Sequence, residues 1–552
     1  MTGLFGGFSL DAARPASDRP LADVLRARRH GSFAELRAHG CALFALGGPA
    51  GQARVEEDES GQLAVAWLSA REGPSAAAVF SAYRAHGPAA VRQLRGAFVL
   101  ALFDRVRRGI LLCRDRAGCW PLFVRAGARD VAFSTSLAPL VRARLAPRVL
   151  DPKGATAFFL YGSLPSPWTL VRGVEAAPAG AAWWADKGGL RRQAFPVDFE
   201  QERASGAVED VIAETASAVR EAIQVRRDTP AVASVLPTGP EQLMLAMHAD
   251  VVNVGPPLPA GQTAARACHM ANARYVELPV SPTPDDLLRI VEWMECPSAD
   301  PAWLRVDASL SWTRDEGRAW VDGVGGEVAF GADPRYPDVL TTQAISRALP
   351  SRLVRVGQRL GRLREVRADL LGPDARALLD PDFRRTLPSD GDTEGTLGAL
   401  QQVHFAASIC SLELPARFSL CAAHGVEAHA PFADARLLDR VAGWPVRARA
   451  DGRDVGTGLR RLSRLLAPQL VFEPRPQPTL LEPVGDWYRG PLRETAEAVL
   501  FGAPGGGSGI LDSSRARRIW YAHQLGVRDH GPIIHAAVLF ELWWAHLFGS
   551  SR

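Results

Sequence analysis

Apolar and polar residues alternate over short distances through residues 1–195, and glycine or proline interrupts the alternation every few positions. Runs of this kind are typical of β-strands that bury one or both faces. A helical spacing of apolar residues at 74–86 lies among them, so this part predicts an α+β sandwich. The clearest strand-like runs are 41–46, 63–68, 97–103 and 109–113.

The pattern changes after residue 205. Residues 207–226 have the spacing of an amphipathic helix, and later strand-like runs are separated by helical stretches. Such β/α alternation predicts an open, mostly parallel sheet, so we expect an α/β protein with two domains, 1–195 and 205–552. The acidic stretch 389–398 predicts an exposed loop. The strand-like runs of this part are 232–236, 251–254, 275–280 and 319–321.

The run at 232–236 leads through a Pro-Thr-Gly turn into a helix whose apolar spacing begins at Glu241. In an open α/β sheet such a loop lies at the carboxyl end of a strand and the amino end of a helix. Free backbone N–H groups and the helix dipole favour phosphate there. The sequence therefore predicts that this loop is the place where a nucleotide would bind.

Composition excludes several classes of function. The 552 residues are 47% apolar, which is enough for more than one core, and 64 basic against 60 acidic side chains leave a net charge of only +4. No basic block stands out, so nucleic acid is not an expected partner. The chain has only two lysines, Lys153 and Lys187. Any mechanism that needs an ammonium group after residue 187 is excluded.

Cysteine usage and hydropathy predict the compartment. Seven cysteines are scattered without a C-x-x-C pair, which favours core thiols in a reducing compartment over disulfides or a zinc site. The first ten residues lack the basic flank and apolar core of an export signal. The longest apolar stretch, 533–548, is interrupted by His535, Glu541 and His546 and falls short of a membrane span. We expect a cytoplasmic protein without a membrane partner.

Residues 94–124, LRGAFVLALFDRVRRGILLCRDRAGCWPLFV, resemble the glutaminase half of the asparagine synthetase family, which runs LxGxFAFALxD and then LxLARDRxGxxPLY. The resemblance implies a class II amidotransferase domain of the Ntn-hydrolase type, whose nucleophile is an N-terminal cysteine activated by its own amine. Here Thr2 stands in that place, and residues 65–80 offer no counterpart of the family's NGE and SD signatures. We expect an inactive scaffold, and we keep Thr2 as a candidate nucleophile.

The loop after residue 235 resembles the LSGGxDS nucleotide loop of the same family, which implies a PP-loop domain of the adenine-nucleotide α-hydrolase type. Proline in the second place removes a donor N–H, and the threonine after it puts a branched side chain where glycine lets phosphate approach. We therefore interpret the loop as vestigial. Its residues are Leu236, Pro237, Thr238, Gly239, Pro240, Glu241 and Gln242.

A second nucleotide motif of the family, SGxGxDExFGG, is met by DGVGGEVAFGA at 322–332, where Gly323 and Gly325 keep their places. The two metal-binding aspartates of the family are replaced by Glu241 and Glu327. Two glutamates could hold a displaced divalent cation. We favour the alternative that they are drifted or salt-bridged side chains, because the phosphate donors around them are lost as well.

A third motif, SMAxGxExRxPFLD in the family, is met at 419–434. Glu427 is in place, and His429 stands where the family has an arginine. We keep both as candidate catalytic residues. Counting back from Glu427 puts Gln401 and its neighbours where the family has a further glutamate.

Two lysines complete the synthetase site of the family, and this chain has Gly456 and Gln477 in their places. The second of these lysines neutralises the polyphosphate and the charge that develops during adenylation, an effect on the order of several kcal/mol for groups of this kind. Its loss is hard to reconcile with ATP-dependent amide synthesis.

Three interpretations remain. The first is an asparagine-synthetase-like pseudoenzyme without ATP or glutaminase activity, which acts as a binding or partner subunit in the maturation of peptides or specialised metabolites. The second is a divergent ligase that uses ATP and magnesium, similar to β-lactam synthetases and lasso-peptide cyclases, which also lack the N-terminal cysteine. The third is a nucleotide-free acid/base reaction in the old cleft. We favour the first and expect no cofactor, a peptide or small-molecule ligand, protein partners and, from the family, self-association.

Overall fold

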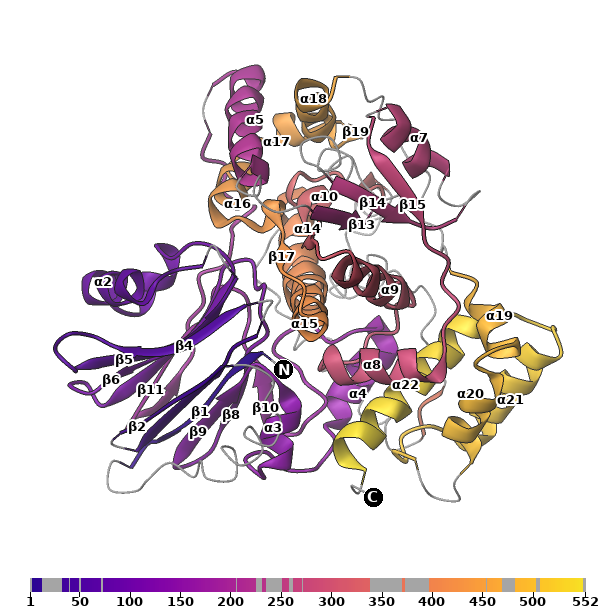
Figure 1. Ribbon diagram of the computed structural model, residues 1–552, viewed down its shortest axis with the longest axis horizontal. Coiled ribbons are helices and arrows are strands. Elements are labelled where there is room, and N and C mark those ends of the chain that lie inside the picture. The colour runs from indigo at the N-terminus through magenta and orange to yellow at the C-terminus, as the bar shows by residue number, and fades with distance from the viewer. Residues whose placement is uncertain are drawn as a thin grey trace, which may run out of the picture.

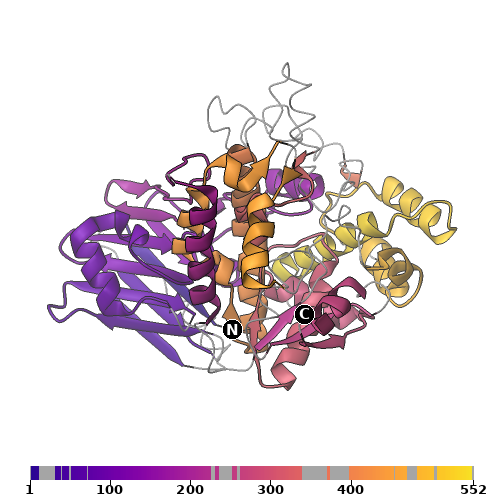
Figure 2. The same ribbon diagram turned by 90° about the horizontal axis from the view of Figure 1, so that it is seen from above.

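The computed structural model describes residues 2–11, 32–38, 40–48, 51–70, 73–204, 206–224, 231–234, 251–257, 262–270, 272–337, 370–372, 397–452, 454–468, 482–502 and 507–549. An antiparallel sandwich comes first along the chain, and a parallel sheet surrounded by helices follows (Figure 1). The predicted fold class, an α+β sandwich followed by an α/β part with a mostly parallel sheet, is confirmed. Figure 2 shows the sandwich and the C-terminal helices on opposite sides of a central group of helices.

The sandwich has two six-stranded antiparallel sheets, in the orders β10-β8-β9-β1-β3-β2 and β12-β11-β7-β6-β5-β4. Helix α2 (Ala76–His86) packs its apolar side chains on the outer face of the second sheet. The strands are β1 (Gly3–Ser9), β2 (Phe33–Ala38), β3 (Cys41–Leu46), β4 (Gln52–Glu57), β5 (Leu63–Ser69), β6 (Phe98–Asp104), β7 (Gly109–Arg114), β8 (Phe123–Ala126), β9 (Asp130–Ser134), β10 (Val174–Ala176), β11 (Ala182–Asp186) and β12 (Gly189–Arg191).

The central strands of the sandwich are buried on both faces, which explains why they are apolar throughout. All seven residues of β6 (FVLALFD) are buried, and so are those of β1. In β1, a Cβ on Gly6 would lie 2.3 Å from the ring of Phe133 and 2.5 Å from the carbonyl oxygen of Ala42. Glycine at this position lets β1 pair with β3 on one side and β9 on the other.

The second part is built on a five-stranded sheet whose strand pairs are all parallel, in the order β15-β14-β13-β16-β17. From β13 the chain adds β14 and then β15 on one side, and from β16 it adds β17 on the other side, so the strand order reverses between β13 and β16. The carboxyl ends of strands that flank such a reversal form the crevice in which open α/β folds bind ligands. The strands are β13 (Ala231–Ser234), β14 (Val251–Gly255), β15 (Arg274–Glu277), β16 (Ala319–Val321) and β17 (Ala428–His429).

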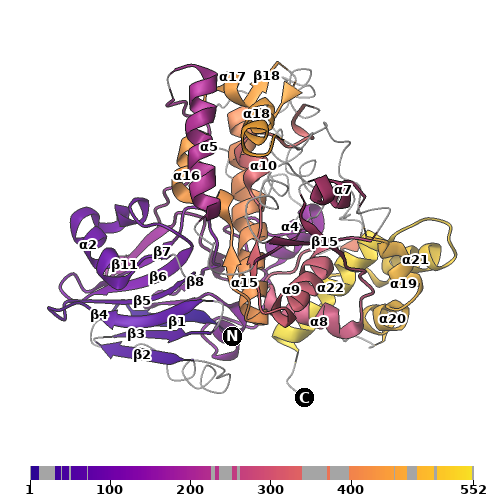
Figure 3. The ribbon, with the colours of Figure 1, turned by 45° about the horizontal axis from the view of Figure 1, so that its top comes forward.

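Helices surround this sheet, and α19 to α22 form a lobe on the side away from the sandwich (Figures 1 and 3). Helix α3 (Leu137–Arg142) instead contacts β9 of the sandwich. The other helices are α4 (Pro152–Tyr161), α5 (Val208–Gln224), α7 (Gln262–Met270), α8 (Pro284–Trp293), α9 (Ala302–Asp315), α10 (Gly326–Ala329), α16 (Ala435–Ala442), α17 (Val446–Arg449), α18 (Thr457–Leu466), α19 (Val484–Arg489), α20 (Arg493–Phe501), α21 (Ser513–Gln524) and α22 (Gly531–Phe548). A short hairpin of β18 (Ala450–Asp451) and β19 (Asp454–Val455) precedes α18.

One continuous helix, Leu397–His424, runs between the two parts (Figure 1). It comprises α14 (Leu397–His404), a π-helical segment η4 (Phe405–Glu413) and α15 (Leu414–His424). The N–H of Leu414 bonds to the carbonyl of Ile409 in the π-helical register, and Pro415 has no N–H to offer to Cys410. The carbonyl of Cys410 is therefore open to a donor from outside the helix.

Arg114, at the end of β7, supplies that donor and joins the sandwich to the central helix. Its Nη2 donates to the carbonyl of Cys410 at 2.9 Å. The remaining donors bond to carbonyls of Gly118 (2.7 Å), Trp120 (2.5 Å) and Ala177 (2.7 Å). Complete burial lowers the pKa of this guanidinium, and the neighbouring carboxylate opposes the shift. Four hydrogen bonds thus stabilise a cation in the interior.

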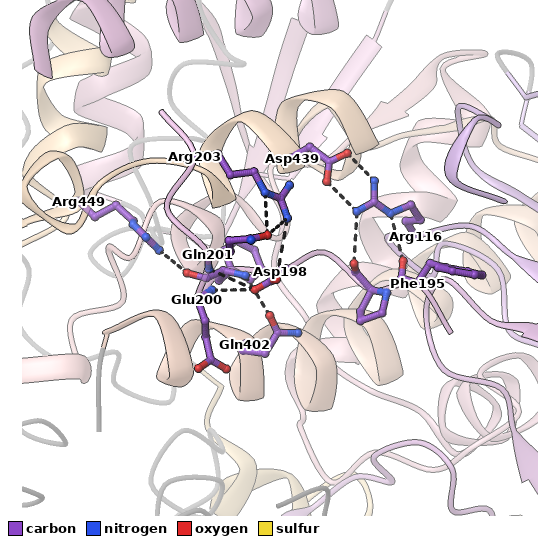
Figure 4. A network of polar contacts seen from close by, with 11 residues as sticks. Arg116, Phe195, Asp198, Glu200, Gln201, Arg203, Gln402, Asp439 and Arg449 are labelled. Atoms are coloured by element: carbon purple, nitrogen blue, oxygen red, sulfur yellow. Dashed lines mark hydrogen bonds and ion pairs between the residues drawn. The ribbon is translucent and has the colours of Figure 1, made fainter. Parts of the chain in front are cut away.

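The linker after β12 is fixed on the second part by polar contacts (Figure 4). Arg116 of the sandwich forms a two-pronged ion pair with Asp439 of α16. The N–H of Phe199 in the linker donates to Gln402 Oε1 at 3.1 Å, and its carbonyl accepts from Arg449 at 3.1 Å. The sandwich, the linker and the central helix therefore share one hydrogen-bonded interface.

Among the described residues, two helices are long and apolar enough to cross a membrane, Leu397–His424 and Gly531–Phe548. In each of them 67% of the most apolar window is buried inside the protein. This burial is typical of helices that form the core of a folded domain.

One predicted element is wrong. Residues 389–398 were expected to form an exposed loop, yet Leu397 and Gly398 begin α14 and are buried. A Cβ on Gly398 would lie 2.6 Å from the carbonyl oxygen of Phe199, so the helix start is packed directly on the linker. The rest of the segment, 389–396, lies outside the described residues.

Arg114→Met tests the joint between the two parts. Methionine offers no donor to the four carbonyls and leaves the carboxylate of Asp115 without its cation, so we expect a loss of about 3–5 kcal/mol in the free energy of unfolding. Urea unfolding followed by tryptophan fluorescence measures the loss. The control is Arg192→Met, which breaks an exposed ion pair with Glu175 and should cost less than about 1 kcal/mol. Equal losses in the two variants would contradict this role of Arg114.

Candidate functional site

Asp322 lies where the strand order of the parallel sheet reverses. It directly follows β16, and its N–H donates to the carbonyl of His429 on β17 at 2.9 Å. Its carboxylate accepts from Arg417 Nε at 2.6 Å and from the N–H of Val324 at 2.9 Å. Trp320 Nε1 adds a longer contact of 3.4 Å. A carboxylate is therefore fixed at the crevice where folds of this class bind ligands.

Arg417, on α15, joins Asp322 to a second carboxylate, that of Glu413 one turn earlier. Its guanidinium also lies over the ring of Trp303, 5.0 Å from the centroid. The three charged side chains are at most 8% exposed. Burial by itself would lower the pKa of Arg417, but the two carboxylates outweigh burial and raise the pKa above its ordinary value. Arg417 is therefore a permanent cation committed to protein carboxylates.

Asp322, Arg417 and Glu413 form what we call the charge cluster. With both acids ionised it holds two negative charges and one positive charge, a net charge of −1. Two unit charges about 4 Å apart interact by roughly 4 kcal/mol at an effective dielectric constant of 20. Each carboxylate is thus bound firmly to Arg417, and the cluster has no spare positive charge for an anionic ligand.

Glu327, in α10, lies beside a second ion network. Arg335 Nε donates to Asp333 Oδ1 at 2.8 Å. Burial acts to lower the pKa of Arg335, whereas Asp333 and, more weakly, Glu327 raise it, and the net shift is upward. The carboxylate of Glu327 is therefore in the field of an arginine. The described residues hold no group of three or more His, Cys, Asp or Glu side chains that could bind a metal, and they do not include Glu241.

Gly456, where the family has a lysine, is the N-cap of α18 and has a left-handed backbone with φ of 73°. Its N–H donates to the carbonyl of Arg449 at 2.8 Å. A Cβ here would lie 2.7 Å from the Cβ of Ala332, the last residue of the second nucleotide motif. The space that the first atom of a lysine side chain would need is therefore filled by that motif.

Glu427 directly precedes β17, and His429 ends this strand. The carbonyl of Glu427 accepts from the N–H of Trp320 at 2.8 Å, which extends the pairing of β16 with β17. His429 Nε2 lies 3.0 Å from the carbonyl oxygen of Ala222 on α5. The structure brings His429 and Asp322 together at the carboxyl ends of β17 and β16, whereas Glu427 lies at the amino end of β17. The Nε2 of His429 is engaged by a backbone carbonyl.

Gln401, where the family has a glutamate, lies under the second nucleotide motif. Its Nε2 donates to the carbonyls of Val328 (2.9 Å) and Ala329 (2.7 Å), and its Oε1 accepts from Arg449 Nη1 at 2.7 Å. The side chain is completely buried. Gln401 therefore supplies a donor to the carbonyl of Ala329 and a second donor to that of Val328, which also accepts the N–H of Gly331.

Thr2 lies in the sandwich at the start of β1, apart from the crevice. A Cβ on Gly48 would lie 2.4 Å from Thr2 Oγ1, and Gly48 pairs with Gly51 in a short bridge. The ring of Trp120 lies 3.4 Å from where a Cβ on Gly51 would be, and its buried Nε1 has no hydrogen-bond partner. Gly48 therefore lies directly beside the predicted nucleophile.

The first nucleotide loop lies beyond the part of the chain that the structure describes. Strand β13 ends at Ser234, and the loop and Gln477 lie outside the described residues. The roles predicted for these residues stay predictions. The loop residues concerned are Leu236, Pro237, Thr238, Gly239, Glu241 and Gln242.

Sequence reasoning missed the charge cluster. Glu413 and Arg417 are 91 and 95 residues beyond Asp322 in the chain, and no local pattern connects them. One signal was present, because Asp322 occupies the place of a serine in the family motif. A buried carboxylate in place of a small hydroxyl group requires a nearby cation.

Gly456→Ala tests how tightly the two motif segments pack. The left-handed backbone and the contact with Ala332 together should cost about 2–4 kcal/mol of unfolding free energy. The matched control is Gly452→Ala, which has φ of 58° and nothing within 4 Å of its Cβ, and should cost only the backbone strain of about 1–2 kcal/mol. Urea unfolding of the two variants measures the difference. Identical losses would mean that the region around Ala332 can move aside.

Comparisons with known proteins agree with this architecture. A protein of Mycobacterium bovis named as an asparagine synthetase (glutamine-hydrolysing) is 23% identical over 523 residues, which cover 85% of this chain and 79% of the relative, and the same values hold for proteins of two Mycobacterium tuberculosis strains. A solved glutamine phosphoribosylpyrophosphate amidotransferase from B. subtilis covers 50% of this chain and 65% of its own, with 8% identity and a TM-score of 0.22, too low to carry an argument.

Family profiles identify both parts of the chain. The profile described as a glutamine amidotransferase domain matches residues 71–196, within the part that contains Thr2 and Arg114. The profile described as asparagine synthase matches residues 259–545, the part that contains the charge cluster and Gly456. Since the second match alone spans more than half of the 552 residues, the chain belongs to the asparagine synthase family.

Proposed function

We propose that this protein is a member of the family that binds partners but does not make amide bonds at the expense of ATP. In this role it acts as a cytoplasmic subunit in the maturation of a peptide or a specialised metabolite, nearest in organisation to β-lactam synthetases and lasso-peptide cyclases. It uses neither ATP nor magnesium. The glutamine amidotransferase part is kept as a scaffold and does not release ammonia.

The charge cluster is the observation that carries this proposal. A triphosphate that enters the crevice at the strand-order reversal meets the carboxylate of Asp322, and Arg417 has its Nε and Nη1 engaged by Asp322 and Glu413. A carboxylate about 5 Å from a phosphate charge costs roughly 3 kcal/mol at an effective dielectric constant of 20. Arg417, bound to the same carboxylate, offsets part of this cost, but its engaged Nε and Nη1 are not available to the phosphates.

The missing lysine supports the same conclusion. Gly456 leaves no room for a side chain beside Ala332, and the chain has no lysine after residue 187. Glu327, in the place of a metal-binding aspartate, is in the field of Arg335. The described residues of the crevice therefore fit a magnesium–nucleotide complex poorly, and no reaction step is derived through one.

The scaffold role of the first part is supported by the contacts that join it to the second. Arg114 and Arg116 connect the sandwich to the central helix and to α16. Removing the sandwich would leave the carbonyl of Cys410 and the carboxylate of Asp439 without these donors. The sandwich would therefore be needed for the stability of the second part even if it has no glutaminase activity.

Thermal unfolding with and without magnesium and ATP tests the absence of a nucleotide site. A ligand present at about 100 times its dissociation constant stabilises a protein by roughly 2.7 kcal/mol, which raises the melting temperature by several degrees in a typical domain. We expect no shift for this protein, while an active asparagine synthetase in the same buffer should show one. A clear shift, together with release of pyrophosphate when a candidate peptide is added, would instead identify a divergent ligase.

Glutamine hydrolysis tests the scaffold role of the sandwich. We expect the full-length protein to release no glutamate from glutamine, because residues 65–80 lack the family's glutamine-holding signatures and threonine replaces the nucleophilic cysteine. Coupled detection of glutamate measures the rate. A rate that disappears in Thr2→Ala but persists in Thr2→Ser would show that Thr2 is an active nucleophile, and this part of the proposal would be wrong.

A further inference from the structure

Helix α21 has one face that is firmly anchored in the C-terminal lobe. Ala516, Trp520 and His523 are buried and recur at the spacing of one helix face. His523 Nε2 lies 3.0 Å from the carbonyl oxygen of Gly485, and His523 Nδ1 accepts the N–H of His530 at 3.2 Å. The helix is therefore held in a fixed orientation relative to α19 and α22.

Large apolar side chains are exposed at the end of α21 and in the turn that follows it. Tyr521 is 56% exposed, and Leu525 and Val527 are each 77% exposed. Tyr521 and Leu525 are four residues apart and lie on the same side of the helix. We call Arg518, Tyr521, Leu525 and Val527 the α21 patch. The other exposed large apolar side chains of the described chain are dispersed over separate segments.

The backbone after α21 fixes the end of the patch. Gly526 takes a left-handed conformation with φ of 70°, and its N–H donates to the carbonyl of His523 at 3.1 Å. The N–H of Val527 then donates to the carbonyl of Ala522 at 3.0 Å. The backbone that carries Leu525 and Val527 is thus already fixed by hydrogen bonds, so ordering these residues on binding would cost little entropy.

The surroundings of the patch are positively charged. Residues 513–528 contain four arginines and no aspartate or glutamate. Asp512, at the N-cap, pairs with Arg515 at 3.4 Å, and the guanidinium of Arg517 lies over the ring of Phe501 at 4.6 Å. Asp529, which follows the segment and is 61% exposed, lies 3.4 Å from His523 Nδ1, so the four arginines outnumber the two flanking aspartates. Arg518, one helical turn before Tyr521, is exposed. Anionic groups are therefore favoured around the apolar side chains.

We propose that the α21 patch is a docking surface for an acidic, amphipathic segment of a partner protein. Tyrosine and arginine around an apolar centre are typical of protein interfaces, and apolar anchors at helical spacing match the recognition of an amphipathic helix. Two aliphatic side chains exposed to 77% gain nothing from a phosphate backbone, which disfavours nucleic acid. Three apolar side chains also form a smaller face than membrane-binding helices present.

The patch is separate from the crevice. Figures 1 and 3 place α21 at the outer edge of the C-terminal lobe, whereas α10 lies beside α14 near the centre of the second part. Docking at α21 is therefore independent of nucleotide binding. A failure of either proposal can be distinguished from a failure of the other.

The test uses the full-length protein and two fluorescent peptides with leucines at the same helical spacing, one with glutamate and one with lysine at the polar positions. We expect the acidic peptide to bind at least about tenfold more tightly than the basic one, and its affinity to fall with added salt. Leu525→Asp and Arg518→Glu should each reduce binding of the acidic peptide by at least about tenfold. Fluorescence anisotropy measures the dissociation constants.

The control variant is Val106→Asp. Val106 is 69% exposed, lies in the turn between β6 and β7, and is not part of the α21 patch. It should leave binding unchanged, and circular dichroism should show the same fold for all variants. Equal binding of the two peptides, or no effect of Leu525→Asp, would overturn the proposal. The proposal would also be wrong if the acidic peptide does not bind and the protein instead binds anionic vesicles, an oligonucleotide or a second copy of the chain in a way that Leu525→Asp abolishes.

Discussion

The structure depends on buried guanidinium groups that must find acceptors. Arg114 reaches the central helix from the sandwich, and Arg417 reaches out of the same helix to the parallel sheet. Both are buried, so each costs stability unless all its neighbours are correctly placed. The proline at position 415 makes the first contact feasible because it leaves the carbonyl of Cys410 open. One helix is thereby locked to both parts of the protein.

This arrangement explains how the nucleotide motif can keep its shape while its chemistry changes. Gln401, near the start of the central helix, bonds to the carbonyls of α10, and Arg417, further along, bonds to Asp322. Both contacts hold the segment 322–329 through protein groups alone. The position of this segment is therefore fixed in part by the central helix. Its geometry is therefore weak evidence for a retained activity.

The sequence was informative wherever local pattern decides structure. Runs 41–46 and 319–321 coincide with β3 and β16, because each is a short apolar stretch between turn residues. The helix expected at 74–86 begins at Ala76 instead, since Ser75 caps it by accepting from Ala78. The strand predicted at 275–280 is longer than the observed one. Strand β15 ends at Glu277, and a proline follows two residues later.

The sequence was less informative about the site, for a physical reason. Spacing along the chain says which residues share a helix face or a strand edge, but the charge cluster joins residues more than ninety positions apart. The resemblance to the family located Glu427, His429, Glu327 and Gly456 at their places in the motifs. It could not show that Arg335 lies in the field of one of them or that Ala332 fills the space beside another.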